Sequence, residues 1–171
     1  MTTARHQPSD FRPILSEIGG EFPRSSILVA QAAIDHQLEL LLKIRLKASL
    51  AEAVLKTLFG DGALYGSYAR RVDAAHLMGL IGPETVRDLQ LIGEMREECV
   101  RNMRVISFET GRIAECFRQL RQPGKPHPSV TPGQLRLVFA GLVYELVQGL
   151  MMKSGNCAAL DPDHTATHVS E

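Results

Sequence analysis

The chain of 171 residues has the length of one ordinary domain, and its hydrophobic content of 44% is enough for a buried core. Nineteen basic and nineteen acidic residues cancel to a net charge of zero, which argues against a protein that binds nucleic acid duplexes mainly through their phosphates. Three cysteines without CxxC spacing indicate reduced thiols, and the polar N-terminus lacks the apolar core of a signal peptide, so we expect a cytoplasmic protein.

Hydrophobic periodicity predicts helices along almost the whole chain, and no segment shows the alternation of a strand. The predicted helices cover residues 9–18, 25–46, 49–59, 67–79, 84–102, 112–120 and 134–153. The glycine pair Gly19-Gly20, the loop GDGALYG and a proline-rich segment separate several of them. We therefore predict an all-α fold, a single-domain bundle of about six or seven helices over residues 9–153. A flexible arm at 1–8 and a disordered tail at 154–171 complete the prediction.

The last predicted helix is apolar on two faces. A helix of this kind either lies at the centre of a bundle or contacts a second subunit. We therefore predict a homodimer, with one apolar stripe contributing to its interface: Leu135, Val138, Leu142, Leu146 and Leu150. The most apolar part, residues 137–152, contains Glu145 and Gln148 and is short for a bilayer span, so no membrane contact is predicted.

Two charged residues interrupt apolar stripes. Arg96 stands in the row that contains Leu89, Ile92 and Cys99, and Asp35 interrupts the stripe of the helix at 25–46. Because an unpaired charge facing a core is costly, we predict that Arg96 and Asp35 form a buried ion pair that Glu39 shares. A ligand contact or a catalytic role for Arg96 are the alternatives.

Further arginines are candidates for an anion site. Arg70 and Arg71 lie at the start of a predicted helix, where the helix dipole disfavours positive charge, so a carboxylate or an anionic ligand is expected nearby. The alternative for this pair is a solvated helix start. Arg101, at the end of the following helix, is a further candidate for an anion contact.

No motif in the chain predicts catalysis, and no catalytic residue, metal site or cofactor is expected. His164 and His168 have the spacing of two metal ligands on a helix, but the predicted tail has no apolar face to order them. The hairpin at residues 74–89 has the outline of a helix-turn-helix. Its second helix begins with Glu84 and Asp88, which repel phosphates, so no direct specific DNA binding is predicted.

The segment YARRVDAAHLMGLIGPETVRDLQLIGEMREECV resembles the signature region of the mannitol operon repressor (MtlR) family of bacterial regulators. The matching residues are Arg71, Val72, Ala75, Gly79, Leu80, Ile81, Asp88, Leu89, Ile92 and Arg96. Upstream, AAIDHQLELLL is similar to a helix of the family, which adds Asp35, Leu38, Glu39 and Leu42 to the match. The resemblance extends over about residues 29–120. It implies a helical-bundle regulator that acts through protein contacts.

The end of this signature departs from the family pattern. Family members tend to have Arg-Asn-x-Phe-Ala-His, whereas this chain has Arg96-Glu97-Glu98-Cys99-Val100-Arg101. A similar Arg…His ending forms the active site of the HEPN ribonucleases, in which the histidine handles protons. Because arginine replaces that histidine, no group here titrates near neutral pH.

We therefore predict a non-enzymatic transcriptional regulator with an unidentified protein partner. The alternative is a HEPN-like bundle that binds nucleotide or RNA, or keeps residual nuclease activity, through Arg70, Arg71, Arg96 and Arg101. Clustering of these four arginines in one cleft would favour that alternative.

Overall fold

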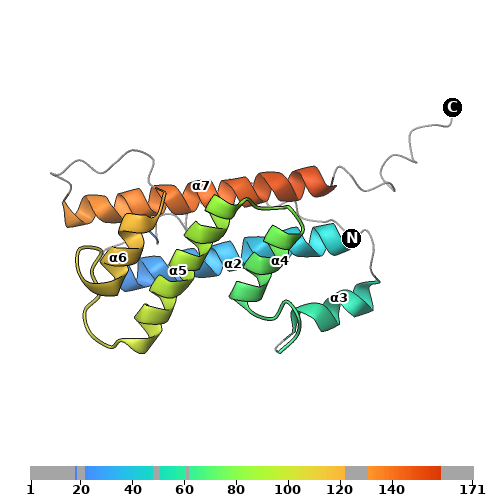
Figure 1. Ribbon diagram of the computed structural model, residues 1–171, viewed down its shortest axis with the longest axis horizontal. Coiled ribbons are helices and arrows are strands. Elements are labelled where there is room, and N and C mark those ends of the chain that lie inside the picture. The colour runs from blue at the N-terminus through green and yellow to red at the C-terminus, as the bar shows by residue number, and fades with distance from the viewer. Residues whose placement is uncertain (1–17, 19–21, 48–50, 61, 122–130, 159–171) are drawn as a thin grey trace.

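The computed structural model describes residues 18, 22–47, 51–60, 62–121 and 131–158. Within these residues the chain forms six helices and no strand, which confirms the predicted all-α bundle (Figure 1). The helices are α2 (Pro23–Lys47), α3 (Glu52–Phe59), α4 (Tyr68–Leu77), α5 (Pro83–Arg101), α6 (Gly111–Gln119) and α7 (Pro132–Ala158). The predicted helix at 9–18, the arm, the proline-rich loop and His164 and His168 lie outside the described residues, apart from Ile18 and the two ends of the loop.

The sharp turn between α4 and α5 follows directly from its sequence. Gly79 has a φ of +70°, which a residue without a side chain adopts at little cost. The amide of Leu80 donates to the carbonyl of Ala75 at 2.9 Å, and that of Gly79 donates to His76 at 2.9 Å, the two bonds of a Schellman motif. Pro83 then begins α5, where its missing N–H is not needed. The hairpin therefore holds α4 and α5 side by side.

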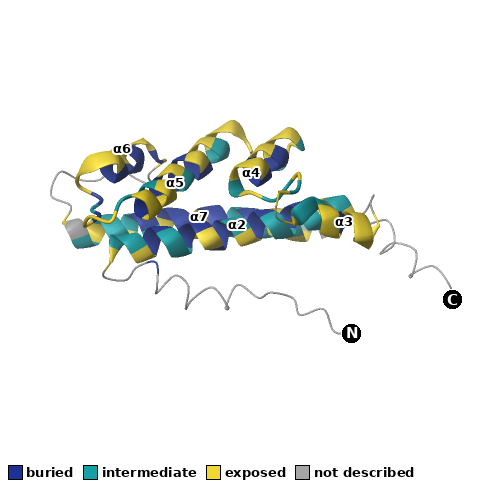
Figure 2. Cartoon of the chain, turned by 90° about the horizontal axis from the view of Figure 1, so that it is seen from below, coloured by how far each residue is buried: buried dark blue, intermediate teal, exposed yellow. Residues whose placement is uncertain are grey.

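The core forms around α2, which contacts α3, α4, α5 and α7. Helix α7 runs alongside α2, while α4 and α5 cross it (Figure 1). Buried residues concentrate along α2 and α7 (Figure 2). The rings of Phe108 and Phe139 lie 5.2 Å apart, and Phe117 of α6 lies 5.2 Å from Phe108, which joins α6 to α7. The two long helices thus form a base on which the shorter helices pack.

Helix α7 corrects three sequence predictions. It continues to Ala158, past the predicted boundary at 153. Its stretch Gly133–Gly155 has a mean hydropathy of 1.5 and is, by length and composition, long and apolar enough to cross a membrane. The prediction that the apolar part of this helix is short for a bilayer span is therefore wrong. Leu142, Leu146 and Leu150 are buried in the chain's own core, so the prediction that they form a subunit interface is also wrong. Helix α7 packs along α2, and one-third of its most apolar window is buried.

The homodimer itself stays a prediction. Leu135 and Val138, the other two residues of the predicted interface, are partly buried against the core of the same chain. The large apolar side chains that α7 exposes to solvent are Leu137, Tyr144 and Met152. A dimer formed through α7 would therefore use this outer face rather than the predicted stripe.

Arg24 connects the start of α2 to the end of α5. Its guanidinium donates hydrogen bonds to the carbonyl oxygens of Cys99, of Asn102 at 2.7 Å and of Arg104 at 2.9 Å. The last carbonyls of a helix have no partner within the helix, so a charged donor at this point replaces water. The contact fixes the crossing of α5 over α2.

Replacement of Arg24 by methionine should leave these three carbonyl groups without their donor. We expect Arg24→Met to lower the free energy of unfolding by about 1–3 kcal/mol, measured by urea denaturation. Arg45→Met, on the exposed side of the same helix, is the matched control and should change it by less than about 0.5 kcal/mol. Equal effects of the two substitutions would show that the cap adds nothing to stability.

Candidate functional site

An arginine on α4 joins two carboxylates on α2. Arg71 Nη1 donates to Asp35 Oδ1 at 2.7 Å, and Arg71 Nη2 lies 2.9 Å from Glu39 Oε2. Asp35 and Glu39 are one helical turn apart on α2, so one guanidinium reaches both of them. Arg71 is only 8% exposed, and charge-assisted hydrogen bonds of this kind gain strength when water is excluded. The ion pair holds α4 against α2.

The prediction that Arg96 neutralises Asp35 is therefore wrong, because Arg71 provides the guanidinium. Arg96 is exposed on α5. The row from Ile92 to Cys99 can pass through position 95 or position 96, since steps of three and four residues both stay on one helix face. Met95 is fully buried and takes the inward position, as expected for the apolar member of the pair.

A cleft opens beside this ion pair, between α2, α4 and α5. Its volume is about 680 Å³. Its lining residues are Gln31, Asp35, Ser67, Tyr68, Ala69, Val72, Asp73, Gln90, Gly93, Glu94, Arg96 and Glu97. We refer to this space as the α2–α4–α5 cleft. Asp35 thus belongs both to the ion pair and to the cleft, which places the ion pair at the edge of a cavity large enough for a ligand.

Tyr68 forms one wall of the cleft. Its hydroxyl donates to the carbonyl of Leu89 at 2.9 Å, and burial together with the charge of Asp35 raises the pKa of Tyr68 well above its usual value. Its ring lies against Gly93, where an added Cβ would come within 3.1 Å of Tyr68 Cε1. The missing side chain at Gly93 therefore lets the ring pack closely on α5. The phenol is a fixed hydrogen-bond donor and stays protonated.

The cleft is predominantly acidic. Its lining contains four carboxylates, those of Asp35, Asp73, Glu94 and Glu97, and a single guanidinium, that of Arg96. Glu94 is paired with Arg112 at 2.5 Å and Glu97 with Arg101 at 3.6 Å. Among the described residues, Asp73 has no ion-pair partner. Three of the four lining carboxylates are therefore paired with arginines, and the charge of Asp73 is the one left to attract a cation.

The four arginines of the nucleotide-binding alternative do not gather in this cleft. Arg71 is neutralised by α2, and Arg70, which does not line the cleft, donates to the carbonyl of Ala63 at 2.8 Å. Arg101 is exposed and pairs with Glu97 on its own helix. Only Arg96 lines the cleft. The expected anion site at Arg70, Arg71 and Arg101 is therefore not assembled.

A second buried ion pair, which the sequence does not predict, joins α5 to the end of α6. Asp88 is 1% exposed and accepts hydrogen bonds from Arg121 Nε at 2.6 Å and from the Arg121 amide at 3.1 Å. Arg121 also reaches Glu84 at 3.2 Å. The Asp-Leu pair of the family signature singled out Asp88, but no sequence signal connects it to a residue 33 positions away. Asp88 is a structural residue rather than a phosphate-facing one.

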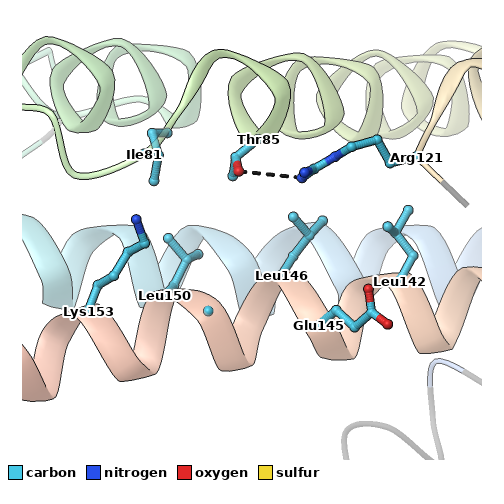
Figure 3. A pocket seen from close by; sticks show the side chains of 9 residues that line it. Ile81, Thr85, Arg121, Leu142, Glu145, Leu146, Leu150 and Lys153 are labelled. Carbon is cyan, nitrogen blue, oxygen red and sulfur yellow. Dashed lines mark hydrogen bonds between the residues drawn. The ribbon is translucent and has the colours of Figure 1, made fainter. Parts of the chain in front are cut away.

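Arg121 also lines a groove of about 380 Å³ between α5 and α7 (Figure 3). Three leucines of α7 form its apolar side, Leu142, Leu146 and Leu150, and Ile81 faces them (Figure 3). The two cations are already bound, because Arg121 contacts Asp88 and Lys153 donates to the carbonyl of Leu80 at 2.6 Å. The groove therefore offers few free polar groups to a ligand.

Two thiols in the part of the chain that the structure describes, those of Cys99 and Cys116, are buried. Burial raises the pKa of the Cys116 thiol to about 11, and its Sγ lies 3.6 Å from Glu94 Oε2, so it is protonated and poorly nucleophilic at neutral pH. Burial also raises the pKa of Cys99. Among the described residues no group of three or more His, Cys, Asp or Glu side chains could hold a metal ion.

The fold has a counterpart among known structures. The X-ray structure of the MtlR–HPr complex from Escherichia coli contains a chain with a TM-score of 0.67 and 16% sequence identity to this one. The match covers 84% of this chain and 99% of that chain. The fold is MtlR-like. No family model and no curated protein matches the sequence, so the MtlR-like description applies to the fold alone.

The ion pair of the MtlR-like bundle gives a direct test. Arg71→Met should leave two carboxylates of α2 without their partner and lower the free energy of unfolding by about 3–5 kcal/mol, measured by urea denaturation. A double-mutant cycle of Arg71→Met with Asp35→Leu should show coupling of about 0.5–3 kcal/mol. The same cycle with Arg96→Met in place of Arg71→Met is the control. Its two changes in the free energy of unfolding should simply add. Coupling of Asp35 to Arg96 instead of Arg71 would contradict the structure.

Proposed function

We propose that this chain is a non-enzymatic, MtlR-like regulator that acts by binding another protein. The observation that carries the proposal is the extent of the structural likeness, which includes 99% of the matched chain. The matched structure is a complex with HPr, so a bundle of this architecture presents a surface to a protein partner. An HPr protein is therefore the first partner to test.

The composition of the α2–α4–α5 cleft favours this proposal over the nucleotide-binding alternative. A phosphate site needs cations that are free to approach it, and Arg71 is neutralised by Asp35 and Glu39. The remaining cation of the cleft, Arg96, stands among carboxylates. A site of this composition binds the phosphates of RNA poorly, but it can still contact the polar surface of a protein.

Action on transcription would then pass through the partner rather than through DNA. Helix α5 begins with Glu84 and carries further carboxylates at Glu94, Glu97 and Glu98, so its surface disfavours a phosphate backbone. We place this activity in the cytoplasm, where thiols such as those of Cys99 and Cys116 stay reduced. Homodimer formation through the outer face of α7 remains compatible with this proposal.

The proposal predicts that the full chain binds the HPr protein of its own organism. Isothermal titration at about 0.1 M salt should give a saturable complex, with a dissociation constant in the micromolar range that is typical of transient regulatory contacts. The control is the same titration with an unrelated small protein of similar charge to HPr. The absence of a heat signal at about 100 μM HPr would contradict the proposed partner. Cleavage of single-stranded RNA by the chain, abolished by Arg96→Ala, would instead support the HEPN-like alternative.

A further inference from the structure

The α2–α4–α5 cleft contains a nearly buried polar side chain without a partner. Gln31 of α2 is 9% exposed, and it lines the cleft. It makes no hydrogen bond with any residue that the structure describes. A side-chain amide has two donor sites and an oxygen acceptor, and those of Gln31 are not among the buried unsatisfied polar atoms, so a group in the cleft can reach them. Gln31 therefore offers hydrogen bonds to a group that enters the cleft.

The charges of the cleft determine which group can enter. Asp73, on α4, is exposed and lacks an ion-pair partner among the described residues. Asp35 uses Oδ1 for its bond to Arg71, and about a quarter of its side chain, 27%, remains accessible. Glu94 and Glu97 are paired with arginines that do not line the cleft, so Asp73 is the lining carboxylate without an ion-pair partner among the described residues. Asp73 thus offers its free charge to a cation that enters the cleft.

We propose that the α2–α4–α5 cleft binds a basic segment of the protein partner and receives one of its arginine or lysine side chains. This inference rests on the proposed function, because it names the chemistry of the partner that the regulator binds. The cationic group would donate hydrogen bonds to the free carboxylate of Asp73 and to the amide oxygen of Gln31. The aromatic wall of Tyr68 adds a surface on which a guanidinium packs favourably.

The dimensions of the cleft fit this occupant. A volume of about 680 Å³ holds a long side chain together with neighbouring backbone of the segment that carries it. Gly93 contributes by letting the ring of Tyr68, a wall of the cleft, pack directly on α5. A bare metal ion is a poorer occupant, because the described residues provide no group of three or more His, Cys, Asp or Glu side chains for it.

A peptide titration tests the cleft without any assumption about the identity of the partner. The full, ¹⁵N-labelled chain is titrated with the capped tripeptide Ala-Arg-Ala, and amide shifts are recorded by NMR at low salt. We expect saturable shifts of the Gln31 side-chain amide and of the Asp73 and Gly93 backbone amides. The matched tripeptide Ala-Glu-Ala should leave these signals in place. Shifts caused equally by both peptides, or shifts located elsewhere, would overturn the inference.

Two substitutions in the cleft make the test specific. Asp73→Asn removes an exposed, unpaired charge. It should lower the affinity of the chain for the arginine peptide by about threefold to tenfold. Gln31→Leu keeps the size of the side chain and removes its polar atoms, and it should weaken binding by about tenfold. Glu109→Gln, an equal charge change at an exposed position outside the cleft, is the control and should bind like the unmodified chain. Unchanged affinity in Asp73→Asn, whose exposed site tolerates the change, would overturn the inference.

Titration of HPr into the same variants separates the two proposals. Weaker HPr binding by Asp73→Asn but not by Glu109→Gln would support the cleft as the site of contact. Equal HPr binding by all variants would overturn the inference and leave the proposed function standing. Peptide shifts in the cleft combined with no HPr binding would support cation binding there, while the proposed partner would fail.

Discussion

The contact of Arg71 with Asp35 and Glu39 is the constraint on which the rest of the site depends. Asp35 and Glu39 bring negative charge to the side of α2 that faces α4, next to the core of the bundle. A guanidinium that reaches both carboxylates offsets the cost of removing their charges from water. The same contact fixes the position of α4. A hydrogen-bonded turn at Gly79 joins α4 directly to α5, so the position of α4 constrains that of α5. The α2–α4–α5 cleft is the space that remains between the three helices.

Sequence periodicity was sufficient for the fold and insufficient for the contacts. Helix α5 was predicted at 84–102 and observed at Pro83–Arg101, because a proline and an acidic first turn mark its start and apolar spacing marks its length. The same spacing could not decide between Met95 and Arg96 as the inward residue, so the ion pair was assigned to the wrong arginine. The polar partner of Asp88 was beyond prediction, since Arg121 meets it only through the packing of α6.

The α7 stripe shows a second limit of sequence patterns. An apolar row indicates burial but does not distinguish a core of the same chain from the surface of a second chain. In this bundle Leu142, Leu146 and Leu150 are buried in the chain's own core, where α7 packs along α2. At 16% identity the two chains share an MtlR-like bundle, but a shared fold does not imply a shared function. The function of the cleft is therefore inferred from the charge and geometry of its own residues. The proposed contact with a basic protein segment rests on Asp73, the lining carboxylate without an ion-pair partner among the described residues.

The central claim is that this bundle binds a protein through the acidic cleft. The most direct measurement is NMR cross-saturation of the deuterated, ¹⁵N-labelled chain in complex with protonated HPr, which identifies the amides that lie at the contact. The account predicts that signal loss is centred on residues 69–73 of α4 and 90–97 of α5, on both sides of the cleft. Signal loss centred instead on the outer face of α7, around Leu137 and Tyr144, would contradict it.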